Sequence, residues 1–268
     1  MITPIRLLAL CAALLAAAPL RAGDGLPAEV VRGEVLGGWT TEAGHRMAGL
    51  RLTLAPGWKT YWRAPGDAGI PPTFDWTGSD NLAGVRVHWP APEIFESFGM
   101  RTAVYSDEVV LPLELRPERP GAPIRLRAEV DLGVCETVCI PARVQVAADL
   151  DGAGAMDPTI RAALAARPMT EARAGVGAVD CALSPIADGL RLDAAIAVPR
   201  LGAREAALVE AGDPGIWVSE PLVARQGDTL RVRVDLVPPR GAALALDRGA
   251  LRFTLLGSRR SVDVQGCD

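Results

Sequence analysis

The sequence predicts an all-β protein of two antiparallel β-sandwich domains, joined by a linker that carries a short helix. Short runs in which apolar and polar residues alternate recur along the chain, and turns rich in glycine and proline separate them. A helical period is almost absent. The length of 268 residues exceeds one average domain, and a hydrophobic fraction of 49% is enough to fill two cores. Together these features favour stacked antiparallel sheets.

The first 22 residues have the layout of a secretory signal peptide. Arg6 precedes an unbroken apolar run from Leu7 to Leu20, and the small residues Ala22 and Gly23 follow. No later stretch reaches the roughly 18 to 20 apolar residues that a membrane-spanning helix needs. We therefore expect export to the periplasm and a soluble mature chain.

The first domain is expected over residues 24–150, and alternation defines its strands. The clearest run has apolar side chains at every second position from Ile124 to Leu132, which brings a strand directly into Cys135. The predicted strands of this domain are residues 30–54 with breaks, 73–76, 85–89, 104–115, 124–134 and 144–150.

Two loops are expected between these strands. Residues 56–72 read as an aromatic-rich strand followed by a long loop, because their glycines and prolines exclude a helix. Residues 90–99 read as a second loop, which carries Phe95 and Phe98 in exposed-looking positions.

The linker is expected over residues 151–175. It begins with a glycine-rich stretch, residues 151–155, that indicates a flexible break. Asp157 then has the position of a helix cap, and Pro158 that of the first helical residue, so a short helix is predicted over residues 158–167. A second, smaller β-sandwich follows over residues 176–268. Its predicted strands are residues 190–198, 206–210, 217–219, 230–237, 250–256 and 262–264.

Charge excludes one class of partner. The formal net charge is −4, and Lys59 is the only lysine. Nucleic acids and anionic membrane surfaces are bound by concentrated lysine and arginine. We therefore expect no nucleic-acid partner.

The cysteines indicate disulfides. Of the five cysteines, Cys11 lies in the predicted signal peptide, which leaves an even set of four in an exported chain. Four cysteines allow three connectivities, and spacing favours Cys135 with Cys139 and Cys181 with Cys267. If the first and last strands of the second domain lie side by side, the Cys181–Cys267 bond closes a long loop, and we assign it a structural role.

The close pair admits three interpretations: a structural disulfide, a soft-metal site and a redox-active dithiol. Zinc is disfavoured because a closed site needs four ligands and the only histidines, His45 and His88, are distant in sequence. Copper(I) needs fewer ligands and stays open as an alternative. A disulfide across so short a turn removes little conformational entropy from the unfolded chain, so it would stabilise the fold only weakly. We therefore favour the redox dithiol, with no organic cofactor.

The chain resembles the periplasmic N-terminal domain of the thiol:disulfide interchange protein DsbD, and more closely its relatives of the ScsB type. The two-domain layout with a late cysteine pair is also similar to the ScsB type. The resemblance rests on three segments: Gly57-Trp58-Lys59-Thr60-Tyr61-Trp62-Arg63, residues 98–112 with Val104-Tyr105-Ser106-Asp107-Glu108, and Val134-Cys135-Glu136-Thr137-Val138-Cys139-Ile140-Pro141.

This resemblance implies an immunoglobulin-like sandwich that passes electrons to other proteins. By position, Cys139 matches the cysteine that attacks a partner's disulfide, and Cys135 matches the one that resolves the mixed disulfide. The region of Phe95 and Phe98 falls where the family has a loop that caps the active site, and Tyr61 and Trp62 fall near aromatic residues that line it. The three-residue spacing between the cysteines is shorter than in DsbD itself.

The partners implied by the family are periplasmic thioredoxin-fold proteins and a membrane-embedded electron carrier of the CcdA or DsbD-beta type. Because this sequence has no transmembrane or thioredoxin-like segment, we expect that carrier to be a separate protein. Glu136 and Asp131 are close to the cysteines in sequence and would hold the thiols protonated if they are also close in space; otherwise they are solvated turn residues. The competing hypothesis is a non-catalytic binding or assembly module in which both disulfides are structural.

Overall fold

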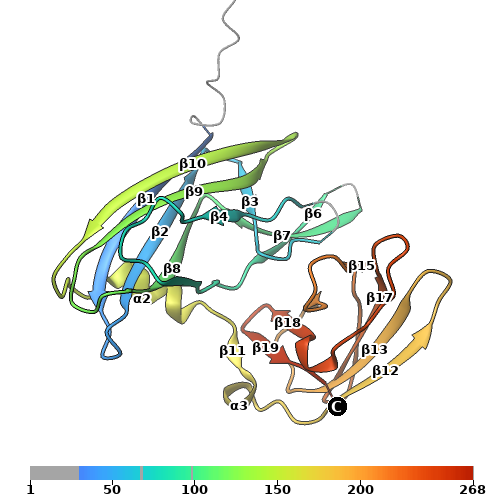
Figure 1. The fold of residues 1–268 in the computed structure, drawn as a ribbon. Helices are drawn as coiled ribbons and strands as arrows, with labels where there is room; N and C mark the ends of the chain where they lie inside the picture. The colour runs from blue at the N-terminus through green and yellow to red at the C-terminus, as the bar shows by residue number, and fades with distance from the viewer. Residues whose placement is uncertain (1–29, 67–68, 98, 268) are drawn as a thin grey trace, which may run out of the picture.

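Two β-sandwiches make up the protein, each built from two sheets (Figure 1). The structure, a computed structural model, describes residues 30–66, 69–97 and 99–267. The predicted signal peptide and Phe98 therefore lie outside the described residues. The predicted all-β fold class is confirmed, including the short helix between the sandwiches.

The first sandwich pairs a four-stranded sheet with a six-stranded sheet, and all of its strand pairs are antiparallel. The four-stranded sheet has the order β1 (Val31–Thr40), β2 (Arg46–Leu54), β8 (Glu108–Arg116) and β5 (Gly84–Val87). The second sheet has the order β10 (Cys139–Leu150), β9 (Ile124–Cys135), β3 (Lys59–Tyr61), β7 (Met100–Ser106) and β6 (Glu93–Ser97), with β4 (Thr73–Asp75) paired to β9.

Strand β9 shows how the sequence positions the candidate site. Its buried side chains alternate from Ile124 to Leu132, as the sequence predicts, and they contribute to the core of the first sandwich. Since successive side chains of a strand point to opposite faces, Gly133 and Cys135 lie on the outer face. The long β9–β10 hairpin then ends in the two cysteines.

One predicted strand is wrong. Residues 104–115 were expected to form a continuous strand, whereas β7 ends at Ser106 and β8 begins at Glu108, in the opposite sheet. Asp107 between them has φ +59°, in the left-handed region. A residue with that backbone conformation interrupts a strand, so the chain crosses from one sheet to the other there.

The second sandwich is smaller. One sheet has the order β11 (Met169–Thr170), β19 (Ser261–Gln265), β18 (Arg252–Gly257) and β14 (Glu205–Glu210), and its β11–β19 pair is parallel. The other has the order β12 (Val179–Pro185), β13 (Leu190–Ala197), β17 (Thr229–Val237) and β15 (Trp217–Val218), with β16 (Leu222–Gln226) also paired to β17. A short helix α3 (Glu171–Ala174) and a 3-10 turn η1 (Arg248–Ala250) complete it.

The stretch between the sandwiches is held against the first one. Within residues 151–155, Ala153 accepts a hydrogen bond from the backbone of Thr40 at 2.8 Å, so this stretch is not the free flexible break expected from its glycines. Helix α2 (Pro158–Ala165) follows, with the Asp157 carboxylate capping its first turn. Its Ile160 is fully buried with side chains of β2 and β8.

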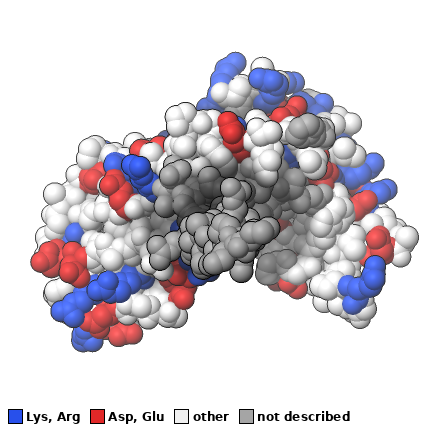
Figure 2. Space-filling view, turned by 90° about the horizontal axis from the view of Figure 1, so that it is seen from above, with Lys and Arg blue, Asp and Glu red and all other residues white. Residues whose placement is uncertain are grey.

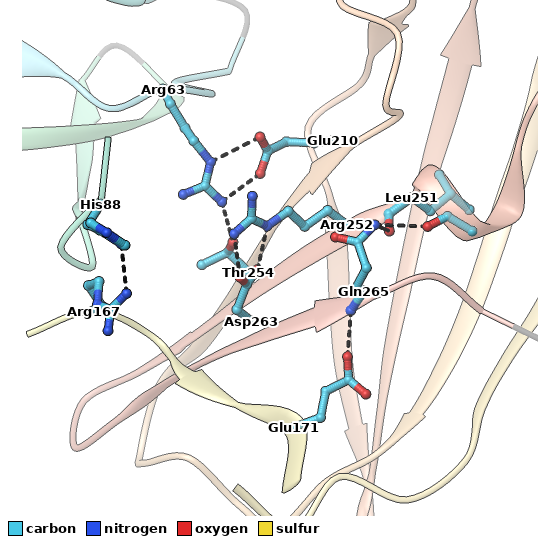
Figure 3. A network of polar contacts seen from close by, with 11 residues as sticks. Arg63, His88, Arg167, Glu171, Glu210, Leu251, Arg252, Thr254, Asp263 and Gln265 are labelled. Atoms are coloured by element: carbon cyan, nitrogen blue, oxygen red, sulfur yellow. Dashed lines mark hydrogen bonds and ion pairs between the residues drawn. The ribbon is translucent and has the colours of Figure 1, made fainter. Parts of the chain in front are cut away.

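The two sandwiches share a packed interface. Leu208 of β14 and Leu256 of β18 are buried in the core of the first sandwich, whereas their neighbours along each strand belong to the core of the second. Arg63, which follows β3, forms a bidentate ion pair with Glu210 at 2.9 and 3.1 Å and also donates to Thr254 (Figure 3). Sheet β11-β19-β18-β14 is therefore apolar on both faces along these two strands.

The outer surface carries charges of both signs. In the described part of the face drawn in Figure 2, Lys and Arg side chains are interspersed with Asp and Glu. No helix among residues that the structure describes is long and apolar enough to cross a bilayer.

Candidate functional site

The candidate site is the tip of the β9–β10 hairpin. Cys135 is the last residue of β9 and Cys139 the first of β10, and the two are direct partners in the strand register. They form a disulfide with a Cα–Cα distance of 4.1 Å. Cys139 is exposed, whereas Cys135 is half-buried. Of the two residues, Cys139 therefore presents more of its surface to another protein.

Tyr61 lies against the disulfide. Its hydroxyl is 3.1 Å from the Cys139 Sγ, although the ring itself is buried. Burial raises the pKa of Tyr61 above its ordinary value, so the hydroxyl keeps its proton at neutral pH and can donate to the sulfur. The predicted position of Tyr61 next to the cysteine pair thus has a direct contact to support it.

Two glycines make room for the Tyr61 ring. A Cβ at Gly133 would lie 2.7 Å from the Ile70 Cβ and 2.9 Å from two carbon atoms of the Tyr61 ring. A Cβ at Gly69 would lie 2.3 Å from the Pro65 Cβ and 2.9 Å from the opposite edge of the Tyr61 ring. Real side chains do not approach this closely, so both positions require glycine for Tyr61 to reach Cys139. Gly133 is in a strand interior, where a glycine often marks such a close approach.

Trp62 does not line the disulfide, and this part of the prediction is corrected. It follows Tyr61 directly, so its side chain points to the opposite face, where it is 0% exposed in the core of the first sandwich. Its ring stacks under the Arg63 guanidinium at 3.9 Å. Trp62 therefore supports the interface between the sandwiches and leaves Tyr61 as the aromatic contact of the sulfur.

The segment expected as a capping loop is a hairpin. Residues 93–97 form strand β6, which pairs with β7, because Glu93 to Ser97 find hydrogen-bonding partners in register along it. Phe95 is half-buried there, and the Lys59 Nζ lies 4.3 Å from its ring centroid. Phe98 lies outside the described residues.

Lys59 was not among the predicted site residues. Its backbone is the register partner of Cys135, so its side chain leaves the same outer face of the sheet as the cysteine. Its status as the only lysine was visible in the sequence, but the pairing of β3 with β9 that makes it the register partner of Cys135 was not. The site thus combines a disulfide and a phenol, and the Lys59 side chain leaves the same face of the sheet, where its Nζ donates to the Gly57 carbonyl at 3.1 Å.

Of the two acidic residues near the cysteines, Asp131 forms an ion pair and Glu136 is exposed to solvent. Asp131 forms a bidentate ion pair with Arg143 of β10 at 2.7 and 3.1 Å, and this carboxylate raises the pKa of Arg143. Glu136 is exposed in the turn. Glu136 is thus a solvated turn residue, which is one of the two options expected from the sequence. Asp131 is not free to act on the cysteines, because Arg143 compensates its charge.

The other two cysteines also form a disulfide, in the second sandwich. Cys181 of β12 and Cys267, after β19, are 86 residues apart, with a Cα–Cα distance of 5.8 Å. Their strands do not lie side by side in one sheet, because β12 and β19 belong to different sheets. The bond therefore ties the two sheets of this sandwich together, with both cysteines packed against its core.

The histidines lie away from the cysteines but close to each other. His45 and His88 both contact the carboxylate of Glu114 on β8, at 2.7 and 3.1 Å. Across the described ranges, no three His, Cys, Asp or Glu side chains form a group able to hold a metal ion.

Comparison with known proteins gives a family match for the first sandwich and a structural match for most of the chain. Residues 32–151 match the family described as thiol:disulfide interchange protein DsbD, N-terminal. The N-terminal periplasmic domain of ScsB from Proteus mirabilis has 26% sequence identity to this chain and a TM-score of 0.65, covering 88% of this chain and 90% of its own. The N-terminal domain of DsbD from Neisseria meningitidis, in the reduced form, has 21% identity and a TM-score of 0.28, covering 48% of this chain and 90% of its own. No curated protein sequence matches the chain.

Proposed function

We propose that this protein relays electrons in the periplasm through the Cys135–Cys139 pair, because residues 32–151 match the family described as thiol:disulfide interchange protein DsbD, N-terminal. The observation that carries the proposal is the position of the pair. A disulfide at an exposed hairpin tip, between residues that are register partners, can open and close without moving the strands behind it. The range of the family match includes both cysteines, and the geometry supports them as the exchanging pair.

The exchange begins with the reduced pair. The Cys139 thiolate attacks one sulfur of a partner's disulfide; a mixed disulfide forms, and the partner's other sulfur leaves as a thiolate. The Cys135 thiolate then attacks the Cys139 Sγ and displaces the partner's remaining sulfur. Two electrons pass to the partner, which gains two thiols after protonation, and the Cys135–Cys139 disulfide remains. No organic cofactor takes part.

Tyr61 and Lys59 favour the two thiolates in this scheme. The Tyr61 hydroxyl, 3.1 Å from the Cys139 Sγ, can donate a hydrogen bond to a negative sulfur more strongly than to a neutral one. Lys59 is the register partner of Cys135 and places a positive charge on the same face. A nearby cation increases the thiolate fraction of a cysteine. In this proposal Phe95 holds Lys59 in place, and Phe95 with Phe98 shields the sulfurs between exchanges.

Electrons must be supplied and consumed by other proteins. The proposed donor is a separate membrane-embedded carrier of the CcdA or DsbD-beta type, and the proposed acceptors are periplasmic thioredoxin-fold proteins. Any acceptor joined to Cys139 by a disulfide of about 2 Å must cover the residues next to it. Val138, 67% exposed, and Ile70, 45% exposed, are large apolar side chains beside the site. We expect the acceptor to meet them with apolar surface around its own cysteines.

A redox titration of the mature protein tests the proposal. The expected result is one couple at a potential accessible to thioredoxin-fold proteins, which disappears in Cys139→Ser and persists in a Cys181→Ser, Cys267→Ser variant. If both disulfides resist reduction until the protein unfolds, the relay is excluded and a binding or assembly module is favoured.

Trapping separates the roles of the two cysteines. Cys135→Ala should accumulate a mixed disulfide with an oxidised thioredoxin-fold protein, because nothing resolves the bond at Cys139. Cys139→Ala is the matched control and should accumulate none. Equal trapping by the two variants would contradict the assignment of Cys139 as the attacking residue.

A further inference from the structure

Two histidines from distant parts of the chain share one carboxylate on the four-stranded sheet of the first sandwich. His45 Nδ1 lies 2.7 Å from one oxygen of Glu114, and His88 Nε2 lies 3.1 Å from the other. The His88 side chain is 11% exposed, and its backbone N–H donates to Pro112 of β8 at 2.8 Å. His88 is therefore fixed in place by the sheet and is nearly closed to solvent.

The second nitrogen of His88 faces a cation. Arg167 Nη1 lies 2.8 Å from His88 Nδ1 (Figure 3). A guanidinium group has only donors, so Nδ1 must accept and cannot carry a proton. The proton of the ring is then on Nε2, where it is donated to Glu114. This arrangement requires a neutral His88.

Arg167 stands where the chain leaves the first sandwich. It follows Ala166, the cap residue of α2, whose carbonyl accepts from the Ala91 N–H at 2.9 Å. Pro168 comes next and has no N–H to donate. Met169 then begins β11, which pairs with β19 of the second sandwich. Among the residues that the structure describes, the His88 contact is thus the last side-chain hydrogen bond from the junction segment, residues 166–170, to the first sandwich before the chain enters the second.

We propose that His88 and Arg167 form a proton-sensitive latch that holds the junction segment when His88 is neutral and releases it when His88 is protonated. Protonation places an N–H on Nδ1, pointing at the N–H groups of Arg167, and adds a positive charge beside the guanidinium. The hydrogen bond is lost and the two cations repel. The inference does not depend on the proposed redox function.

The charged groups around His88 set the direction of the response. Burial lowers the pKa of His88, and the charges of Arg167 and of Arg86 on β5 lower it further, whereas Glu114 on β8 raises it. His45 faces the same Glu114 carboxylate from the β1–β2 turn. Because the net shift is downward, the unfolded chain takes up a proton first. The latch is intact above about pH 6.5 and is lost as the pH falls through the lowered pKa.

Hydrogen exchange on the full mature chain tests the latch. Exchange of the junction segment, corrected for the intrinsic effect of pH, is compared at about pH 7.5 and at a series of lower pH values down to about pH 4, because the pKa of His88 lies below that of an ordinary histidine. We expect about tenfold faster exchange of residues 166–170 at the lower pH, the size of one lost hydrogen bond. His88→Gln, which cannot be protonated, should lose this response. His45→Gln, which also faces Glu114 but does not contact Arg167, should keep it.

A second variant covers the case in which His88→Gln does not fold. Arg167→Met removes the latch without touching the histidines, so its junction segment should exchange at the higher pH as the unaltered protein does at the lower pH. The proposal is overturned if the unaltered protein shows no response, if the response survives in His88→Gln, or if Arg167→Met leaves exchange at the higher pH unchanged.

Discussion

The two disulfides of this protein are chemically the same bond in different surroundings. Cys135 and Cys139 are four residues apart in sequence, at an exposed hairpin tip, with Tyr61 and Lys59 on the same face. Cys181 and Cys267 are 86 residues apart and join two sheets beside a core. A bond that closes a short loop at the surface can be broken at small structural cost, whereas one that closes a long loop restrains the whole unfolded domain. Loop length and exposure thus distinguish a bond for exchange from a bond for stability.

The largest expected difference between the two bonds is in stability. Replacing both Cys181 and Cys267 by alanine should lower the free energy of unfolding by about 4 to 5 kcal/mol, and replacing both Cys135 and Cys139 by about 2 kcal/mol, from the loop-entropy relation. Denaturant unfolding of the oxidised proteins measures both. Equal losses would remove the distinction, because the bond at the hairpin tip would then stabilise the protein as much as the bridge between sheets.

The next effect concerns the slot between Gly133 and Gly69 that holds the Tyr61 ring next to Cys139. Gly133→Ala should destabilise the protein by about 1 to 3 kcal/mol, because its methyl group overlaps Ile70 and the Tyr61 ring. Gly84→Ala is the matched control, since a Cβ there has its nearest contact at 3.6 Å, with the flexible end of Arg116. Unfolding measurements should separate the two variants; a neutral Gly133→Ala would show that the slot is not tight.

Removing apolar side chains beside Cys139 should have a smaller effect, on the rate of exchange with a partner protein. Val138→Ser and Ile70→Ser should each slow electron exchange with an oxidised thioredoxin-fold protein by up to about tenfold, because less apolar surface is buried in the complex. Reduction of the disulfide by dithiothreitol should stay unchanged. Leu222→Ser is the control, because Leu222 is 66% exposed, like Val138, but lies in the second sandwich. Slowing by all three variants would count against a specific contact.

The smallest expected effect is that of the Tyr61 hydroxyl. Tyr61→Phe keeps the ring and removes the donor to Cys139, so alkylation of the reduced protein at Cys139 should slow several-fold at neutral pH, and its pH midpoint should move upward. Because the pKa of Tyr61 is raised by burial, the hydroxyl still carries its proton while Cys139 ionises. Tyr105→Phe is the control: this buried hydroxyl donates to Pro90 at 2.7 Å and should not change alkylation. An unchanged profile in Tyr61→Phe would remove Tyr61 from the mechanism.

Local patterns in the sequence were enough to predict strand β9, the start of helix α2 and the cysteine hairpin. The alternation from Ile124 to Leu132 identifies β9, its buried face and therefore the outer face that carries Cys135. Asp157 and Pro158 identify the start of α2. These features depend on neighbours in sequence, where strand and helix periods act directly.

Features that depend on tertiary pairing were not predicted. Lys59 is the register partner of Cys135 only because β3 pairs with β9, and His45 and His88 are linked only through Glu114 on a third segment. Trp62 was assigned to the site together with Tyr61 because both fall near aromatic residues that line the site in the family that the chain resembles, although neighbours in a strand point to opposite faces. Asp107 adopts a left-handed backbone that aspartate tolerates without requiring it, so the change of sheet left no clear signal.

The leucines at the interface have a consequence for cooperativity. Leu208 and Leu256 complete the core of the first sandwich from strands whose other face completes the core of the second. Neither sandwich can melt without exposing apolar surface of the other, so calorimetry should record one transition, with a calorimetric enthalpy that matches the van't Hoff value. A mutation deep in the second sandwich would then reduce the fraction of molecules with an intact cysteine hairpin, even though it touches none of the residues around the sulfurs.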